Sequence, residues 1–114
     1  MGNGIAYFNG NFIPIDDAKV QVEDRGFQFS DGVYEVIKSY DRVPFELDAH
    51  LDRLQRSLAH LELPMPMERD ELEEIIYTAI NRTSLKDTYI YIQVTRGYAP
   101  RKHDFPKDVK YTRP

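Results

Sequence analysis

The chain has 114 residues and a formal net charge of −4, with 41% hydrophobic and 30% charged residues. This size fits one ordinary domain, and the composition is typical of a globular protein. The negative charge argues against general binding to nucleic-acid backbones, and the absence of cysteine excludes disulfides, thiol catalysis and cysteine-ligated metals.

The first predicted element is a β-hairpin. Residues 5–8 and 11–14 are largely apolar, and they flank an Asn-Gly pair at positions 9–10. Asn-Gly favours the positive φ values of a type I′ turn, which joins adjacent antiparallel strands. We expect a polar loop over residues 16–26 to follow this hairpin.

The next segment, Val33 to Tyr40, is rich in β-branched and aromatic residues and predicts a strand. Because side chains alternate along a strand, its residues divide into two faces. One face carries Tyr34, Val36, Lys38 and Tyr40. The other carries Val33, Glu35, Ile37 and Ser39. A turn at residues 41–42 then leads into a short strand over 43–46.

Two amphipathic helices follow. Leucines recur at helical spacing from Leu47 to Leu61, with Asp48 near the start as the expected cap. Prolines at 64 and 66 end this helix. The second helix is expected from Glu68 to Thr83, with acidic residues in its first turns.

The last predicted strand runs from Thr88 to Arg96, with Ile90, Ile92 and Val94 on one face. Residues 111–114 are compatible with the start of a further strand. Helices between antiparallel strands predict an α+β fold, an antiparallel sheet with two helices packed on one face. No export signal and no apolar run near the roughly 20 residues of a membrane span occur, so we expect a cytoplasmic protein.

Two cationic residues of the first helix are candidates for a binding site. His50 and Arg53 are three apart, so they share one helical face and can converge on one ligand. Arginine offers a planar fork of donors that suits phosphate oxygens. A solvated helical face remains the alternative. The three histidines, at 50, 60 and 103, lack metal-ligand spacing, so no metal site is predicted.

The stretch RGYAPRKH, residues 96–103, is unusually basic for an acidic chain. In an extended segment Arg101 and His103 lie on the same side, which suits the binding of one carboxylate. A polar turn is the alternative. On the predicted strand, the Tyr34 hydroxyl is a candidate donor to a substrate oxygen. Lys38 is a candidate amine only if burial removes its proton near neutral pH.

Three segments together resemble a known family. The sequence EDRGFQFSDGVYE at 23–35 resembles the N-terminal motif of fold-type IV pyridoxal-phosphate enzymes. HLDRL at 50–54, followed by Ser57, resembles their HxxRLxxS element. The sequence YIQVTRG at 91–97, with PRKHDFP at 100–106, is similar to the D-amino-acid aminotransferase branch. Order and spacing agree over essentially the whole chain.

The resemblance implies roles for particular residues. Arg53 would hold the phosphate of pyridoxal 5′-phosphate. Tyr34, Arg101 and His103 would form a trap for the substrate α-carboxylate, the last two reaching in from the partner subunit of a homodimer. His50 would support that site. The substrate pocket would be lined by Val36, Lys38 and Tyr91.

The resemblance also implies what the chain lacks. In this family the Schiff-base lysine, the acidic partner of the pyridine nitrogen and most phosphate-binding residues lie in a C-terminal domain, well beyond position 114. None of the lysines here occupies the family's position; these are Lys19, Lys38, Lys86, Lys102, Lys107 and Lys110. Residues 1–114 are therefore expected to be the small N-terminal domain of such an enzyme, inactive alone.

Three functions remain open from the sequence. The first is a part of a transaminase that moves the amino group of a D-amino acid, such as D-alanine, to a 2-oxo acid, such as 2-oxoglutarate. The second is the corresponding domain of a branched-chain aminotransferase or an aminodeoxychorismate lyase. The third is a non-catalytic domain for dimerisation or small-ligand binding. The motif RxHxFP at 101–106 favours the first.

Overall fold

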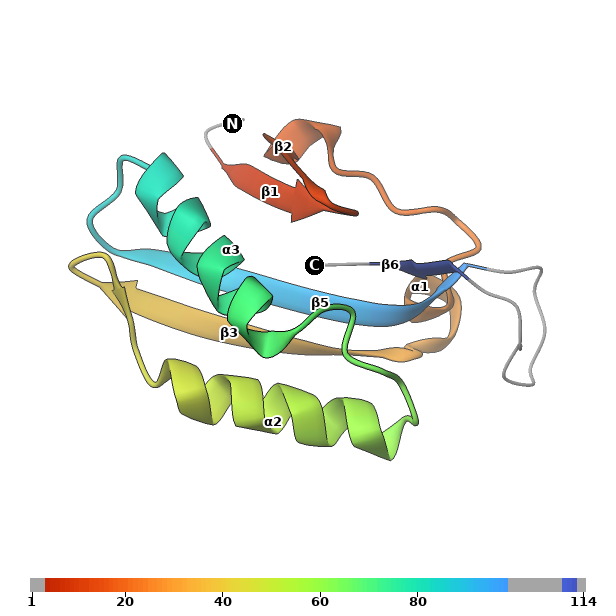
Figure 1. Cartoon of the computed structure of the whole chain (residues 1–114). Helices are drawn as coiled ribbons and strands as arrows, with labels where there is room; N and C mark the ends of the chain where they lie inside the picture. Colours follow the sequence, from red (N-terminus) through yellow and green to blue (C-terminus); the bar gives the residue numbers. More distant parts are fainter. Residues whose placement is uncertain (1–3, 99–109, 113–114) are drawn as a thin grey trace.

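The computed structural model describes residues 4–98 and 110–112 of the chain. Their elements in chain order are β1 (Ile5–Phe8), β2 (Asn11–Pro14), a 3₁₀ turn (Ile15–Asp17), α1 (Arg25–Phe29), β3 (Gly32–Tyr40), β4 (Val43–Pro44), α2 (Leu47–His60), α3 (Arg69–Arg82), β5 (Thr88–Tyr98) and β6 (Lys110–Thr112) (Figure 1).

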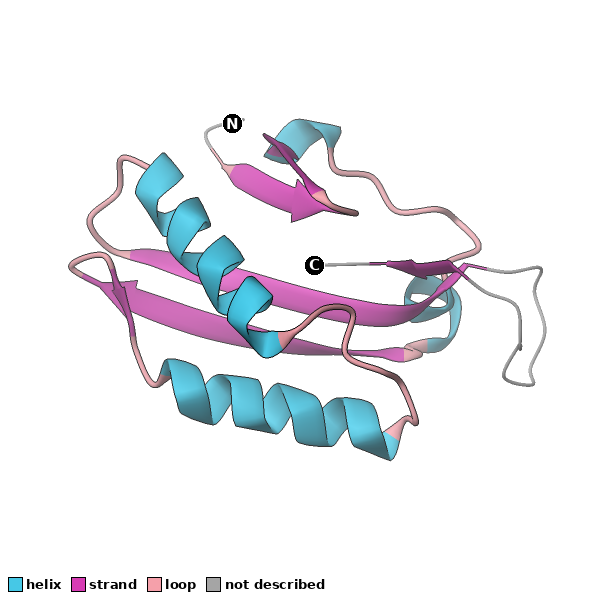
Figure 2. Ribbon diagram, viewed as in Figure 1, coloured by secondary structure: helices cyan, strands magenta, loops and turns pink. Residues whose placement is uncertain are grey.

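The strands form two antiparallel sheets. β1 and β2 make the predicted hairpin, and its turn residues Asn9 and Gly10 both have positive φ, 50° and 98°, as the type I′ turn requires. The main sheet has the order β4-β3-β5-β6. Its two long strands, β3 and β5, pair from Gly32 with Thr95 to Ser39 with Thr88. Figure 2 shows the two long strands running side by side beneath α3.

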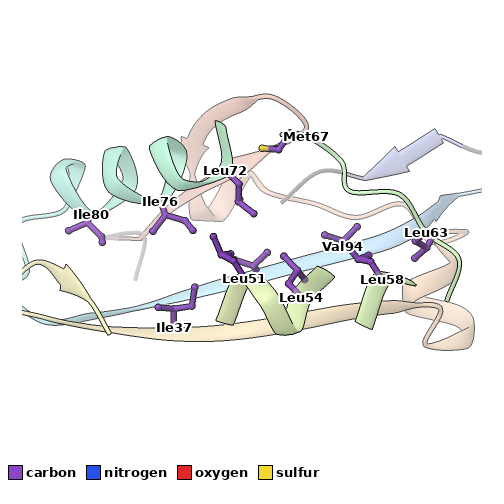
Figure 3. Packing of buried hydrophobic residues seen from close by; sticks show 11 residues of the cluster. Ile37, Leu51, Leu54, Leu58, Leu63, Met67, Leu72, Ile76, Ile80 and Val94 are labelled. Carbon is purple, nitrogen blue, oxygen red and sulfur yellow. The ribbon is translucent and has the colours of Figure 1, made fainter. Parts of the chain in front are cut away.

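The hydrophobic core lies between this sheet and the two long helices. Ile37, Ile92 and Val94 of the sheet are at most 2% exposed. Buried residues of both helices join the same cluster; these are Leu51, Leu54 and Leu58 of α2 and Leu72, Ile76 and Ile80 of α3 (Figure 3). The two helices therefore cover one face of the sheet, and the predicted α+β fold is confirmed.

The start of α2 differs from the prediction. Asp48 does not cap the helix, because the capping position is Glu46, which has a φ of 56° and makes no side-chain cap bond. Asp48 lies inside the first turn. Its carbonyl and carboxylate oxygens accept hydrogen bonds from Arg69, at 3.1 and 3.3 Å. Arg69 thereby links the first turn of α2 to the first turn of α3.

The predicted polar loop is partly helical. A 3₁₀ turn follows β2, and α1 begins after Asp24, whose carboxylate accepts from the Gly26 amide at 2.8 Å. Residue types that cap helices, such as aspartate, are also common in loops, so the sequence does not distinguish a short helix from a polar loop here. Gly26 is required by packing, because a Cβ there would lie 2.3 Å from the Cγ2 of Thr95.

Beyond α1, a buried ion-pair cluster ties three elements together. Asp31 precedes β3, and its Oδ2 accepts from the Nε atoms of Arg25 in α1 and Arg96 in β5, at 2.8 and 2.7 Å. All three side chains are at most 8% exposed. Arg96 also donates to the Leu61 carbonyl, just after α2, at 2.7 Å. The first basic residue of RGYAPRKH is therefore structural.

The end of the main sheet is longer than predicted. β5 continues two residues past Arg96, to Tyr98, because β6 pairs with it there. The register joins Thr95 to Thr112 and Tyr98 to Lys110, with a bulge between the pairs. A further strand near residue 111 is thus confirmed. Arg101, Lys102 and His103 lie outside the described residues.

Candidate functional site

Glu35 is the centre of the candidate site. It lies on the helix-facing side of β3 and is only 3% exposed. The His50 Nδ1–H group donates to Glu35 Oε1 at 2.7 Å, which a carboxylate acceptor requires. Arg53 donates from Nε to Oε2 at 2.8 Å and from Nη2 to Oε1 at 2.9 Å. The structure brings His50 and Arg53 together on one group, a carboxylate of β3, while their convergence on a bound ligand stays a prediction.

Arg53 is both fixed and accessible. Its two bonds to Glu35 form a bidentate pair, which sets the plane of the guanidinium. The side chain is still 60% exposed, and Nη1 makes no hydrogen bond to the described part of the chain. Donors remain on the solvent side of the fork, and they are of the kind that binds a phosphate dianion. The donor set therefore fits the phosphate of pyridoxal phosphate.

Tyr34 lies close to this guanidinium. It precedes Glu35 on β3 but points to the opposite, open face of the sheet. Its proximity contributes to raising the pKa of Arg53, after the larger effects of the hydrogen bond and the charge of Glu35. The Tyr34 ring stacks on Tyr91 of β5, with centroids 5.9 Å apart and planes 17° apart.

The open face of the sheet carries the other predicted pocket residues. Tyr34, Val36, Lys38 and Tyr91 are all exposed and share this face, as period two predicts. Val36 is the cross-strand partner of Tyr91, and Lys38 is the partner of Tyr89. The structure therefore brings these four side chains onto one surface. Their contact with a substrate remains a prediction.

The surroundings of Lys38 favour its charged form. Hydrogen bonds to Tyr40 and then Tyr89 raise the pKa of its ammonium group above the ordinary value. Its Nζ lies 5.0 Å and 5.3 Å from the two ring centroids, within cation–π range. These contacts favour the charged ammonium form over a deprotonated nucleophile.

Other predicted features have no described geometry. Arg101 and His103 cannot be placed relative to Tyr34, since they lie outside the described residues. Within residues 4–98 and 110–112, no three potential ligands of the His, Cys, Asp or Glu type gather to hold a metal ion. The same part of the chain has no helix of the length and apolarity needed to cross a bilayer.

The sequence prediction missed Glu35 as a site residue. The alternation of β3 placed it on the same face as Ile37, which is fully buried. A carboxylate on a buried face requires a charged or hydrogen-bonding partner. His50 and Arg53 lie three residues apart on the following helix and carry the donors that such a carboxylate requires. The pairing of Glu35 with these two residues could therefore have been predicted from the sequence.

The buried carboxylate predicts a specific pH dependence. The hydrogen bond from Arg53 lowers the pKa of Glu35 below its ordinary 4.5, burial opposes this, and the bond from His50 adds to the lowering. Ionised Glu35 therefore stabilises the fold above about pH 4.5. That contribution is lost as the pH falls through the lower, folded-state pKa.

We expect the melting temperatures of the unmodified chain and of Glu35→Gln to differ most at neutral pH and to converge below pH 4. Thermal unfolding between pH 7 and pH 3 measures this difference. Glu74→Gln, an exposed change on α3, is the control and should follow the unmodified chain throughout. A constant difference between the Glu35→Gln variant and the unmodified chain over this range would contradict the assignment.

Comparisons with known proteins find related sequences and related structures. The sequence profile of amino-transferase class IV matches residues 32–112, which include β3, α2 and β5. A D-alanine aminotransferase of Bacillus licheniformis is 39% identical over 112 residues, covering 94% of this chain and 40% of the relative. One from Staphylococcus haemolyticus is 40% identical over 100 residues, covering 88% and 36%.

Solved structures show the same fold. A branched-chain amino acid aminotransferase of Escherichia coli superposes with a TM-score of 0.87 at 26% identity, covering 96% of this chain and 38% of that one. A branched-chain aminotransferase of the thermophilic archaeon Thermoproteus uzoniensis, solved with norvaline, gives a TM-score of 0.82 at 23% identity, covering 96% and 38%.

The chain spans about 40% of the length of the curated relatives it matches. Over that span, the related sequences, the superposed structures and the sequence profile all indicate an aminotransferase family. The profile covers well over half of the chain and includes the Glu35–Arg53 pair. The chain belongs to the class IV aminotransferases.

Proposed function

We propose that this chain is the N-terminal domain of a pyridoxal-phosphate-dependent D-amino-acid transaminase, supplying cofactor-phosphate and substrate-carboxylate contacts. The observation that carries the proposal is the guanidinium of Arg53. It is aligned by two hydrogen bonds to Glu35 and is still 60% exposed. The relatives named D-alanine aminotransferase, at 39–41% identity, support the D-amino-acid substrate class.

Each residue has a part in this proposal. Arg53 holds the phosphate, and Glu35 and His50 fix the direction of its fork. Tyr34 donates to the substrate carboxylate, together with Arg101 and His103 of the partner subunit in a homodimer. The side-chain pocket is lined by Val36, Lys38 and Tyr91. Pyridoxal phosphate would supply the electron sink for the reaction, and the residues of this chain would hold and orient the cofactor and the substrate.

The covalent anchor of the cofactor lies elsewhere in this proposal. A C-terminal domain, as the greater length of the relatives allows, supplies the lysine that the positions of this chain do not offer. Residues 1–114 alone are then expected to give no appreciable transfer from D-alanine to 2-oxoglutarate. Turnover by this chain at the rate of a full-length relative would contradict the assignment of domains.

The phosphate contact can be tested on the chain itself. We expect pyridoxal phosphate to shift the NMR signals of the Arg53 Nε–H group and of Tyr34, whereas pyridoxal, which lacks the phosphate, leaves them unchanged. In Arg53→Ala the apparent affinity should fall roughly ten- to a hundredfold, because charge-assisted hydrogen bonds are lost. Arg56→Ala, an exposed arginine on the same helix, is the matched control. Equal binding by the Arg53→Ala and Arg56→Ala variants would refute the phosphate role.

A second candidate function is branched-chain aminotransferase activity. The superposition with branched-chain enzymes, at TM-scores up to 0.87 among those compared, favours it. The higher identity to D-alanine aminotransferases favours the first candidate. A longer form of the protein that contains this chain should transfer the amino group of D-alanine and not that of L-valine. The reverse preference would select the second candidate.

A further inference from the structure

Gln93 of β5 lies directly across the sheet from Tyr34. The two residues are cross-strand partners, so their side chains stand on the same, open face, with Cβ atoms about 4.5–5.5 Å apart. Both side chains are exposed, that of Tyr34 to 64%. The Tyr34 ring stacks on Tyr91, which also belongs to β5, so the ring lies over the strand that carries Gln93.

The amide of Gln93 has a fixed orientation. The Tyr91 hydroxyl donates a hydrogen bond to the Oε1 atom of Gln93, at 2.9 Å. Because this contact engages the oxygen end of the amide, the two N–H groups of Nε2 point elsewhere. Within residues 4–98 and 110–112, Nε2 makes no hydrogen bond. Gln93 therefore presents oriented donors on the open face, and Tyr91 holds them in place.

The charges near this pair of residues favour an anion. Lys38 carries its ammonium group on the same face, and the guanidinium of Arg53 lies close to Tyr34. The Glu35 carboxylate is on the opposite face of β3 and is engaged by Arg53. A hydroxyl and an amide N–H group in a positive field form a donor pair that suits the two oxygens of one carboxylate.

We propose that Gln93 is a second donor for the substrate carboxylate, its Nε2–H group binding one oxygen while the Tyr34 hydroxyl binds the other. This inference rests on the proposed carboxylate role of Tyr34 and adds a binding residue to that site. Tyr91 becomes a positioning residue, because its hydroxyl aligns the amide. The pair requires two acceptor oxygens, so it selects a free carboxylate over a carboxamide, whose NH₂ group would face one of the donors.

A solvated glutamine is the alternative, and binding of a small carboxylate distinguishes the two. Propionate, which is alanine without its amino group, is the probe, and propionamide is its uncharged counterpart. We expect propionate to shift the NMR signals of the Gln93 side-chain NH₂ group, with saturation in roughly the millimolar range. Propionamide should leave them unchanged, as should propionate the NH₂ signals of Gln55 on α2. Equal shifts by both compounds, or none by propionate, would overturn the proposal.

The variant Gln93→Glu tests the donor itself. Glutamate keeps an oxygen for the Tyr91 hydroxyl but replaces the NH₂ group with a negative charge, so the affinity for propionate should fall roughly tenfold or more. Gln93→Met removes the amide without adding charge and should lose less. Gln55→Glu, the same change beside Arg69 on α2, is the matched control. The Tyr34 ring signals report binding in all variants.

Equal affinities of the Gln93→Glu and Gln55→Glu variants would exclude the donor role. Gln93 is exposed, so its replacement should preserve the fold, and circular dichroism checks this. If Gln93→Glu fails to fold, Gln93→Met decides: an affinity equal to that of the unmodified chain would overturn the proposal.

The variant Tyr91→Phe tests the alignment of the amide. It keeps the ring that stacks on Tyr34 and removes the hydroxyl that bonds to Gln93. The affinity for propionate should fall roughly two- to fivefold, because the amide is then free to rotate. Tyr77→Phe, an exposed tyrosine on α3, is the control and should bind as the unmodified chain does. Equal affinities of these two variants would refute the positioning role of Tyr91.

A longer form of the protein separates this inference from the proposed function. If that form transfers the amino group of D-alanine, Gln93→Glu should raise its KM for D-alanine roughly ten- to hundredfold. Transfer with an unchanged KM would overturn the role of Gln93 and leave the proposed function standing. Propionate binding through Gln93 without transfer from D-alanine would overturn the proposed function and leave the Gln93 donor standing.

Discussion

Replacing Asp31 with asparagine is expected to destabilise the fold by about 3 kcal/mol or more, because the change removes the charge of a buried carboxylate shared by two arginines. Asp31 Oδ2 lies 2.8 Å from Arg25 Nε and 2.7 Å from Arg96 Nε, and the three side chains are almost entirely buried. A total stability of roughly 5–15 kcal/mol is usual for a domain, so a large part of it is at stake. Urea unfolding followed by circular dichroism measures the loss.

The matched control is the same chemical change at a surface ion pair. Asp52 lies 2.6 Å from Arg69, but its side chain is 54% exposed. Exposed pairs contribute about 0–1 kcal/mol, since water screens them and already solvates both charges. Asp52→Asn should therefore shift the unfolding midpoint little. If the two variants lose the same stability, the cluster around Asp31 does not hold α1, β3 and β5 together as the structure indicates.

Replacing Leu54 with alanine is expected to cost about 2–5 kcal/mol, the usual range for a buried leucine. Leu54 is fully buried between α2 and the sheet, among Ile37, Leu51 and Leu58 (Figure 3). The deletion leaves a cavity that closely packed neighbours fill only in part. Differential scanning calorimetry on the 114-residue chain measures the change.

Leu85→Ala is the control for this deletion, because Leu85 is 57% exposed and its truncation should change stability by less than about 0.5 kcal/mol. Leu54 directly follows Arg53 on α2, so the variant also tests how the core supports the site. In partly unfolded samples, the response of Tyr34 to pyridoxal phosphate should decline in parallel with the folded fraction. An undiminished response in unfolded chains would show that binding does not need this helix.

The elements with strong periodicity were predictable from the sequence. The alternation of β3 correctly assigned Tyr34 and Lys38 to one face and Ile37 to the other, because a sheet with one covered face imposes period two. The leucine spacing of α2 identified the helix and its buried stripe. These patterns arise because one face of each element is buried. Burial constrains the polarity of every residue along the element, so the pattern is visible in the sequence.

The features that depend on single contacts were less predictable. Asp48 has the side chain of a helix cap, but contact with Arg69 engages it inside the first turn. Asp24 and Arg25 are polar in sequence, yet they begin a short helix and are buried, because Thr95 and Asp31 supply their partners. Thr95 is distant from Asp24 along the chain, and Asp31 lies outside the helix that contains Arg25. Local periodicity therefore does not predict either contact.

The candidate site was predictable in part. The spacing of His50 and Arg53 predicted that they converge, whereas their shared partner Glu35 comes from a different element and was missed. The turn at residues 41–42 was predicted as well. Its arginine has an unpredicted role, since Arg42 donates to the carbonyl oxygens of Ile80, Thr83 and Leu85 at and after the end of α3. Such carbonyls at a helix end carry no sequence signal.

The edge of β5 over residues 88–94, which has no strand partner on the side away from β3 among residues 4–98 and 110–112, has a consequence for synthesis on the ribosome. The buried core residues of the described part of the chain all lie between Ile37 and Val94, so these core contacts can form once β5 has emerged. At that stage the edges of β1 and β5 are both still open to other nascent chains. Exposed strand edges promote pairing between molecules. A strand edge left open at that stage is therefore the expected point of contact for pairing with another molecule.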